Sequence, residues 1–523
     1  MTNDQPDSET PAPGADGQAN SSDTPPQPAA RTPLLQRTSG VEILFDQKAR
    51  DQMGITSDDQ RIPVLLELNL RYPGGLKDAD ARVRELYQAV RPAGMQDDAI
   101  AIANTYLRCN LTVTETVDLV RRDLDGAEPG RQAVYHVWPD FPAHPLVYRT
   151  ISTITADAAQ RSFGAAGKNI MWAVIDSGID ATHPHFLRFE TLGGEADQLH
   201  RNFTGGADAL ALTDGYGHGT HVAGIIAGGL PDDQDMSGVC VAEHVRNPYA
   251  TDDQTEFSDE PIQFITLPPE SRLMGMAPHC KLVSLKVLDD QGISRTTDIM
   301  RALQYVREDV NGNSKSIIIH GVNLSLGYEF DARWYACGQS PLCVEVDRLV
   351  RTGVVVVVAA GNTGYGWVTV PQGQSQGGLP LTINDPGNAE LAVTVGATHS
   401  DMPHTYGVSF FSSKGPTGDG RLKPDLVAPG ERIISCAAGQ RRDLMHAAGA
   451  PQTAPPYIDD TGTSMAAPHV SGAIAAFLSV RREFIGQPET VKRMFLENAK
   501  SLGRERHFEG YGLIDLMRTI QSV

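Results

Sequence analysis

The sequence predicts an α/β fold in which helices cover both faces of a mostly parallel central sheet. Apolar strands alternate with helices over residues 148–523, and this alternation is typical of a parallel sheet. Polar residues that can carry chemistry stand at the ends of several of these strands, which is where sites form in such sheets. Residues 58–140 predict a smaller α+β domain ahead of the sheet.

Composition and charge limit the classes of function. Hydrophobic residues make up 40% of the 523 residues and charged residues 21%, as is ordinary for a soluble globular protein. The formal net charge of −20 argues against nucleic acid as a partner. No Lys, Arg or apolar run precedes residue 31, and the apolar segment 354–360 is far shorter than the roughly 20 residues that span a bilayer. We therefore expect a cytoplasmic protein with no membrane partner.

The residues before the main domain divide into a tail and a small domain. Residues 1–40 are rich in Pro, Ser, Gly, Ala, Asp and Gln, which predicts a disordered tail. Thr112 is followed three residues later by Glu115, the capping-box pattern of a helix start. Strands are predicted at residues 62–70, 101–111 and 132–138, and helices at 78–90 and 112–122. This order predicts a sheet with its helices on one face.

The main domain contains more strands and helices in alternation. Strands are predicted at residues 169–175, 281–288, 317–326 and 354–360, and helices at 218–228, 298–306, 344–352, 464–484, 488–499 and from 513 onward. An acidic stretch at residues 230–272 fits neither a strand nor a helix well. We expect it to be a surface insertion with two short ordered pieces, one of them near residues 240–244.

Three residues of the main domain have the side chains that nucleophilic catalysis needs. Asp176 ends a buried strand in AVIDSGID, His218 opens a helix in GHGTHVAG, and Ser464 stands in GTSMAAPHVSG. A serine hydroxyl is a weak nucleophile, so it needs a base such as histidine and a carboxylate that orients the base. Taken alone, each residue has an ordinary structural explanation. Asp176 could cap a turn, His218 could be a helix cap or a core residue, and Ser464 could be a helix N-cap. The chain order Asp, His, Ser favours the catalytic interpretation.

The surroundings of Ser464 are suited to a nucleophile. Gly462 and the alanines at 466 and 467 leave little bulk near the hydroxyl. Pro468 is expected in the first turn of a helix, which places Ser464 at or next to the helix start. The free N–H groups of a helix start favour developing negative charge.

These three motifs together resemble the catalytic blocks of the subtilisin-like serine proteases. VNLSLG (residues 322–327) is similar to the substrate-binding strand of that family, and VVVVVAAGN is similar to the block that ends in its oxyanion-hole asparagine. The blocks cover most of residues 150–520 in the family's order. The resemblance implies a subtilisin-like three-layer fold and a serine endopeptidase that acts on proteins or peptides.

The resemblance also implies roles for individual residues. Asp176 would orient the base His218, and Ser464 would be the nucleophile. Asn362, otherwise a turn residue, would donate to the oxyanion beside the Ser464 N–H. The remaining residues would bind substrate, by strand addition at Ser325, Leu326 and Gly327 and as a pocket wall at Ala359, Ala360 and Gly361. No cofactor is required for the chemistry, no metal ligand can be assigned, and structural calcium is an expectation from the family alone.

The small domain also has a counterpart in the family. LTVTETVDLVRRD followed by AVYHVWPD looks like the end of a subtilisin-type propeptide. This resemblance implies a zymogen, in which the small domain assists folding and inhibits the enzyme. The chain would cut itself between about Asp140 and Asp157.

The sequence disfavours two other functions. A catalytically silent binding module is disfavoured because a degenerate copy would be expected to have lost one of Asp176, His218, Ser464 and Asn362. A lipase or esterase is disfavoured because the chain has no G-x-S-x-G elbow at this serine and the order of the three residues differs.

Overall fold

The structure divides the chain into two units, Met1–Ala143 and His144–Val523. The computed structural model describes residues 41–45, 50, 55, 57–92, 95, 99–102, 105–125, 131–139, 149–230, 238–245, 261–267, 271–331, 333, 336–370 and 373–523. The predicted tail, residues 1–40, lies outside the described residues.

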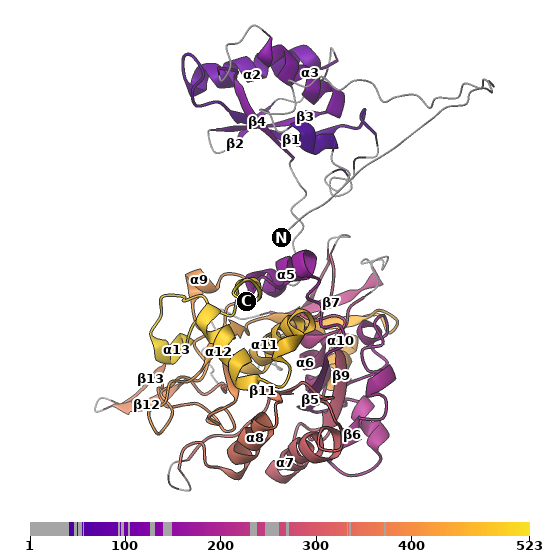
Figure 1. Cartoon of the computed structure of the whole chain (residues 1–523), viewed down its shortest axis with the longest axis vertical. Coiled ribbons are helices and arrows are strands. Elements are labelled where there is room, and N and C mark those ends of the chain that lie inside the picture. The colour runs from indigo at the N-terminus through magenta and orange to yellow at the C-terminus, as the bar shows by residue number, and fades with distance from the viewer. Residues whose placement is uncertain are drawn as a thin grey trace, which may run out of the picture. The chain divides into compact units, whose positions relative to one another are not determined.

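Unit 1 is an antiparallel sheet in the order β2-β3-β1-β4, with two helices on one face (Figure 1). Its elements are β1 (Ile62–Leu68), α2 (Leu76–Val90), β2 (Ile100–Ile102), β3 (Tyr106–Leu111), α3 (Val113–Leu124) and β4 (Val134–Pro139). Alternate residues of β1 are buried, because one face of the strand packs on the helices. Thr112 and Glu115 form the predicted capping box, with both hydrogen bonds at 3.0 Å.

One predicted strand of unit 1 is wrong. Residues 101–111 form two strands, β2 and β3, which pair antiparallel with Ile102 opposite Tyr106. Thr105 lies in a turn immediately before β3, where the predicted single strand is interrupted.

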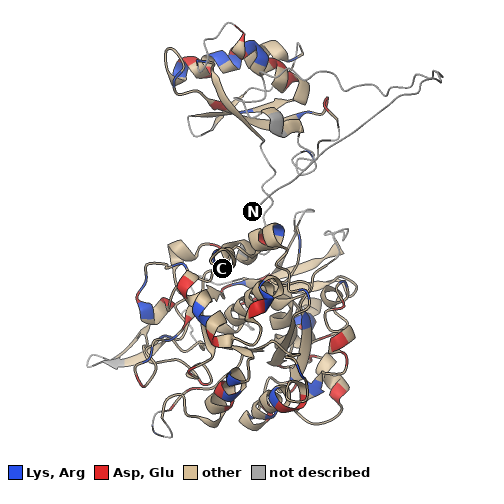
Figure 2. Cartoon of the chain, in the orientation of Figure 1, with Lys and Arg blue, Asp and Glu red and all other residues tan. Residues whose placement is uncertain are grey.

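Unit 2 is built on a seven-stranded sheet in the order β15-β14-β11-β10-β5-β9-β6, in which every pairing is parallel. The strands are β5 (Met171–Asp176), β6 (Arg201–Asn202), β9 (Lys281–Lys286), β10 (Gly321–Leu324), β11 (Val355–Ala359), β14 (Val393–Thr398) and β15 (Leu426–Pro429). Charged residues lie mainly on helices and loops, and few lie on these strands (Figure 2). A sheet buried on both faces requires such apolar strands.

Helices cover both faces of this sheet, as predicted. Trp172 and Val174 of β5 belong to a core with α6 (His218–Ile226) and α11 (Thr463–Val480). Their neighbours Ala173 and Ile175 belong to a second core with α7 (Thr296–Gln304) and α8 (Pro341–Arg351). Further elements of the unit are α4 (Arg149–Thr153), α5 (Ala156–Phe163), a π-helix at Tyr305–Val310, β12 (Tyr365–Val370), β13 (Gly373–Gly378), α9 (Pro403–Tyr406), α12 (Pro488–Asn498), α13 (Arg506–Glu509) and α14 (Leu516–Gln521).

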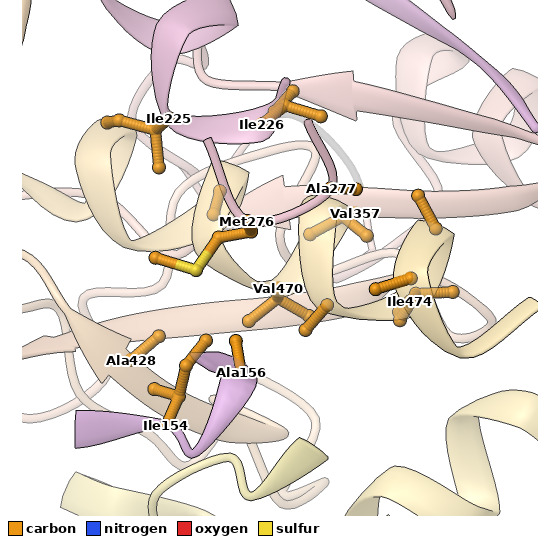
Figure 3. Close-up of a cluster of buried hydrophobic side chains, with 14 of the residues drawn as sticks. Ile154, Ala156, Ile225, Ile226, Met276, Ala277, Val357, Ala428, Val470 and Ile474 are labelled. Atoms are coloured by element: carbon orange, nitrogen blue, oxygen red, sulfur yellow. The ribbon is translucent and has the colours of Figure 1, made fainter. Parts of the chain in front are cut away.

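Helix α11 is the central helix of the first core. In Figure 3, its residues Val470 and Ile474 lie among side chains of other elements, including Val357 of β11. By length and composition alone, its 18 residues could span a membrane. Because 83% of it is buried inside the unit, it is a core helix that positions the residues at its start.

A second, four-stranded sheet in the order β16-β17-β7-β8 lies in the same unit. Its strands are β16 (Ile433–Cys436), β17 (Pro456–Asp460), β7 (Cys240–His244) and β8 (Ile262–Ile265). β7 is the ordered piece predicted within the 230–272 insertion, and β8 is the second. β7 pairs in parallel with β17, which leads into the start of α11. The insertion therefore supports the strand that precedes Ser464.

Two predicted boundaries in unit 2 are corrected. The strand predicted at residues 317–326 is limited to Gly321–Leu324. The terminal helix begins at Leu516 rather than at Leu513, because the Leu513 backbone exchanges hydrogen bonds of 2.7 and 2.8 Å with Lys500. The apolar residues at these two boundaries are buried or half-buried, but their backbone is not hydrogen-bonded as in the predicted strand or helix.

Candidate active site

Three elements bring the predicted triad residues to one end of the central sheet. Asp176 is the last residue of β5, His218 is the first residue of α6, and Ser464 is the second residue of α11. α6 and α11 pack against each other on the same face of the sheet (Figure 1). The carboxyl end of a parallel strand and the starts of two helices thus form the site, as is usual for this class of fold.

Asp176 and His218 form a direct hydrogen bond. Nδ1 of His218 lies 2.7 Å from Oδ1 of Asp176, which also accepts from the Ser177 N–H at 2.8 Å. Burial alone lowers the pKa of His218, but the adjacent Asp176 carboxylate outweighs it and holds this pKa above its ordinary value. A proton on Nδ1 donates to the carboxylate, so Nε2 is left as the basic nitrogen.

The Ser464 hydroxyl is held by the end of β10. It donates to the Ser325 carbonyl oxygen at 3.0 Å. In the other direction, the Ser325 hydroxyl donates to the Ser464 carbonyl oxygen at 2.8 Å and accepts from the Asn323 side chain at 2.9 Å. The predicted substrate-binding residue Ser325 therefore uses its side chain to fix the start of α11.

This contact explains why Pro468 is tolerated where it is. The prediction that Pro468 lies in the first helical turn is wrong, because α11 begins at Thr463 and Pro468 lies inside the helix. A proline has no N–H to donate to the carbonyl four residues earlier, which is that of Ser464. The Ser325 hydroxyl takes the place of that donor.

Asn362 lies beside the start of α11 with a defined orientation. Its Oδ1 accepts from the backbone N–H of Thr463 at 2.9 Å and from the Thr463 hydroxyl at 3.0 Å. The Thr463 hydroxyl in turn accepts from the Gly361 N–H at 3.1 Å. Both Thr463 donors bind the same atom of the Asn362 amide, which identifies that atom as the oxygen. The NH₂ group of this exposed side chain therefore stays available as a donor next to Gly462.

The other predicted substrate-binding residues differ in whether their backbone groups are free to pair with an extended peptide. Gly327 follows the end of β10 and is exposed, so it can meet an extended peptide. The Ala360 N–H donates to Val395 and its carbonyl accepts from Asn384, at 2.9 and 3.0 Å. The segment from Ala359 to Gly361 is therefore engaged within the fold, and it can line a pocket but offers less backbone for pairing.

Sequence reasoning missed Asp214, a buried carboxylate that holds the site together. Its Oδ1 accepts from the Ser177 hydroxyl at 2.8 Å and from the Gly217 N–H at 2.7 Å. Its Oδ2 accepts from the hydroxyl and the N–H of Thr220, at 2.7 and 2.8 Å. Asp214 thus joins the turn after Asp176 to the start of α6. The only signal for it in the sequence is an Asp four residues before the helix-opening histidine.

No metal centre of the usual kind is present in the part of the chain that the structure describes. There, no group of three or more His, Cys, Asp or Glu side chains could hold a metal ion. Structural calcium stays a prediction of the family resemblance.

Buried neutral histidines surround the strand that leads to Ser464. Nε2 of His183 and of His221 contacts the carbonyl oxygens of Pro456 and Ile458 in β17, at 2.9 and 3.0 Å. Nδ1 of His185 lies 3.0 Å from the hydroxyl of Tyr457 in the same strand. Burial lowers the pKa of His183 and His221 to about 4 and that of His185 to about 3.

We expect these histidines to make the fold sensitive to mild acid. In the unfolded chain they bind protons near pH 6.5, whereas in the folded state they stay neutral down to about pH 4. The free energy of unfolding should therefore fall as the pH drops from about 6.5 to 4, by up to roughly 1.4 kcal/mol per pH unit for each histidine. Urea unfolding of the Ser464→Ala variant, which avoids autolysis, measures this slope.

A matched control separates these histidines from the exposed ones. His404 is exposed, so His404→Gln should not change how the free energy of unfolding depends on pH. His183→Gln should make that dependence less steep, by up to the contribution of one proton. A free energy of unfolding that stays constant between pH 7 and pH 5 would contradict the claim that the histidines beside β17 are buried and neutral.

Comparisons with known proteins identify a family and several relatives. The subtilase family model, that of peptidase family S8, matches residues 167–513. Serine protease AprX of Bacillus subtilis is 30% identical over 353 residues, covering 66% of this chain and 64% of AprX. Subtilisin E of Bacillus subtilis is 28% identical over 397 residues, covering 74% and 76%. Pyrolysin of Pyrococcus furiosus is 29% identical over 346 residues, which cover 58% of this chain and 21% of pyrolysin. The chain thus spans about a fifth of pyrolysin and less than two thirds of AprX.

Proposed function

The chain belongs to the subtilase family, and on this basis we propose that it is a serine endopeptidase that forms an acyl-enzyme on Ser464. One observation carries the proposal: His218 is bound through Nδ1 to Asp176 at 2.7 Å and begins a helix that packs against the helix bearing Ser464. A base oriented by a carboxylate beside a serine at a helix start is the arrangement of a triad. Its substrates would be proteins or peptides.

In the proposed mechanism, the Ser464 hydroxyl turns from the Ser325 carbonyl toward Nε2 of His218. The base takes the proton as Oγ attacks the scissile carbonyl carbon, and Asp176 stabilises the imidazolium that forms. The leaving amine then takes the proton from His218. Water repeats the sequence, so that hydrolysis of the acyl-enzyme restores Ser464.

The oxyanion of the tetrahedral intermediate needs donors that are already in place. The proposed donors are the Ser464 N–H at the start of α11 and the NH₂ group of Asn362. The hydrogen bonds from Thr463 to Oδ1 of Asn362 support this role, because they direct the donor end of the amide away from Thr463.

Turnover of a generic protein such as casein tests the proposed activity. The purified chain should release peptides from casein, and a serine-directed phosphonate should stop the release. A pure, folded chain that cleaves neither casein nor any member of a mixed peptide library would overturn the proposal in favour of a silent binding module.

We also propose that the enzyme is made as a self-processing zymogen, with unit 1 as its intramolecular inhibitor. The small antiparallel α+β fold of unit 1 supports this proposal, together with the resemblance of its last strand and helix to a propeptide. The cut is expected before α4, because Ile154 and Ala156 are fully buried and Thr155 bonds to Asp515 at 2.7 Å. A cut after these residues would remove part of the core of unit 2.

We expect the active protein to begin between residues 140 and 149. N-terminal sequencing and intact mass of the purified active form measure this position. The Ser464→Ala variant should keep its original N-terminus, because the chain is expected to cut itself. Full activity with an intact Met1 would contradict the zymogen proposal while leaving the protease itself unaffected.

A further inference from the structure

Helix α10 (Gly439–Ala447) lies directly against the loop that precedes His218. The N–H of Gln440 donates to the Gly215 carbonyl oxygen at 2.9 Å. Gly439 and Gly217 both have positive φ, and a Cβ on either would lie 2.1–2.2 Å from the opposing backbone. Only glycine allows so close an approach, so α10 and the His218 loop hold each other in place.

Two successive arginines extend from α10 to the other two catalytic segments. Arg441 forms an ion pair with Asp460 at 2.5 Å, at the end of β17 and four residues before Ser464. Arg442 forms an ion pair with Asp180 at 2.7 Å, four residues after Asp176. One helix thus contacts all three segments that carry the triad.

Arg441 also contacts Tyr216, which lies between it and His218 in the chain of contacts. Its Nη1 donates to the Tyr216 carbonyl oxygen at 3.4 Å, and its guanidinium lies 5.6 Å from the centre of the Tyr216 ring. That ring is 6.4 Å from the ring of His218. The side chains of Arg441 and Asp460 are only 20% and 17% exposed, so water screens their charges weakly.

We propose that Arg441 is a positioning residue of the catalytic centre, which ties the His218 loop to the strand before Ser464 and neutralises the Asp460 carboxylate. This inference rests on the proposed function, and it assigns a role to a helix outside the triad segments. The intact pair presents almost no net charge to His218. Loss of either partner leaves one partly buried charge unpaired near the base.

Other titratable groups lie on the elements that pack around α6 in the described part of the chain. Asp176 of β5 is its carboxylate partner, and the buried Asp214 contacts the start of its helix. His221 on α6 and His469 on α11 are buried and stay neutral, because burial lowers the pKa of each to about 4. Cys436 on β16 stays a thiol, because burial raises its pKa. Arg441 and Asp460 are therefore a pair of opposite charges near His218 that a substitution can unbalance without touching the triad.

The pH profile of kcat/KM tests the proposal, measured with a peptide substrate on the full chain. In Arg441→Met the uncompensated Asp460 stabilises protonated His218, so the acidic limb should move to higher pH by about 0.5–1 unit. In Asp460→Asn the uncompensated Arg441 should move the limb to lower pH by a similar amount. The double variant should return close to the wild-type limb.

Arg442→Met is the matched control on the same helix. It removes an ion pair of similar length but should leave the acidic limb where it is, because the charges that act most on the pKa of His218 are those of Asp176, Arg441 and Asp460. The proposal would be overturned if the acidic limb of the kcat/KM profile lies at the same pH in wild type, Arg441→Met and Asp460→Asn. If Arg441→Met does not fold, an unshifted limb in Asp460→Asn overturns it equally.

The proposed function fails by a different observation. If the Ser464→Ala variant turns over substrate at the wild-type rate, the proposed protease mechanism is refuted, regardless of the pH profiles of the charge variants. Turnover that is lost in Ser464→Ala, with unshifted limbs in both charge variants, would refute only the role of Arg441.

Discussion

Ser464→Ala is expected to reduce kcat on casein or a peptide substrate by on the order of 10⁶-fold, the loss found for the triad serine in subtilisin itself. The substitution removes the oxygen on which the acyl-enzyme is proposed to form. The fold should survive, because α11 is anchored by its apolar face and by the Ser325 hydroxyl, which bonds to the backbone carbonyl of residue 464.

The control for this experiment is a substitution of Ser325, whose side chain contacts Ser464. Ser325→Ala removes the hydroxyl that bonds to the Ser464 carbonyl but leaves the Ser464 hydroxyl in place. It should lower the free energy of unfolding by about 1–3 kcal/mol, the cost of an unpaired buried carbonyl, and keep measurable turnover. Equal activity of Ser464→Ala and wild type, after exclusion of a contaminating protease, would contradict the assignment of the nucleophile.

Asn362→Leu is expected to lower kcat by about 10²–10³-fold with little change in KM, again the size known for the corresponding donor in subtilisin. Leucine has nearly the same shape but cannot donate to the oxyanion. The interaction exists only when negative charge develops, so the effect should appear in kcat. Steady-state kinetics on a peptide substrate measure both constants.

Thr463→Val separates the donor from the contact that orients it. Valine removes the hydroxyl that bonds to Oδ1 of Asn362, but the Thr463 N–H still holds that oxygen at 2.9 Å. A loss of less than about tenfold is expected, well below that of Asn362→Leu. If both variants lose activity equally, or if Asn362→Leu changes only KM, Asn362 is not an oxyanion donor.

Much of the fold could be predicted because its signals are local. The apolar runs at residues 169–175 and 354–360 coincide with β5 and β11 to within one or two residues at each end, and the capping box at Thr112 marks the start of α3. The residues flanking Asp176, His218 and Ser464 likewise placed each of them at the end of a strand or the start of a helix, where the structure has them. Each pattern depends on neighbours within a few residues.

The missed features depend on contacts between distant segments. β17 reads PYIDD, which has no strand pattern, and it forms a strand because it pairs with β16 and with β7 from the insertion. α10 has no side-chain cap, and its contacts with the His218 loop are visible only in three dimensions. Pro468 misled for the same reason, because its missing hydrogen bond is supplied by Ser325, 143 positions earlier in the chain.

The most direct test of the central claim is to locate the adduct of a serine-directed phosphonate by peptide mass spectrometry. The proposed mechanism predicts one adduct, on Ser464, in the wild-type chain. It predicts none in Ser464→Ala and strongly reduced labelling in His218→Ala, because the unassisted hydroxyl is a poor nucleophile. An adduct on another residue, or undiminished labelling of Ser464→Ala, would contradict the claim that Ser464 is the nucleophile of this enzyme.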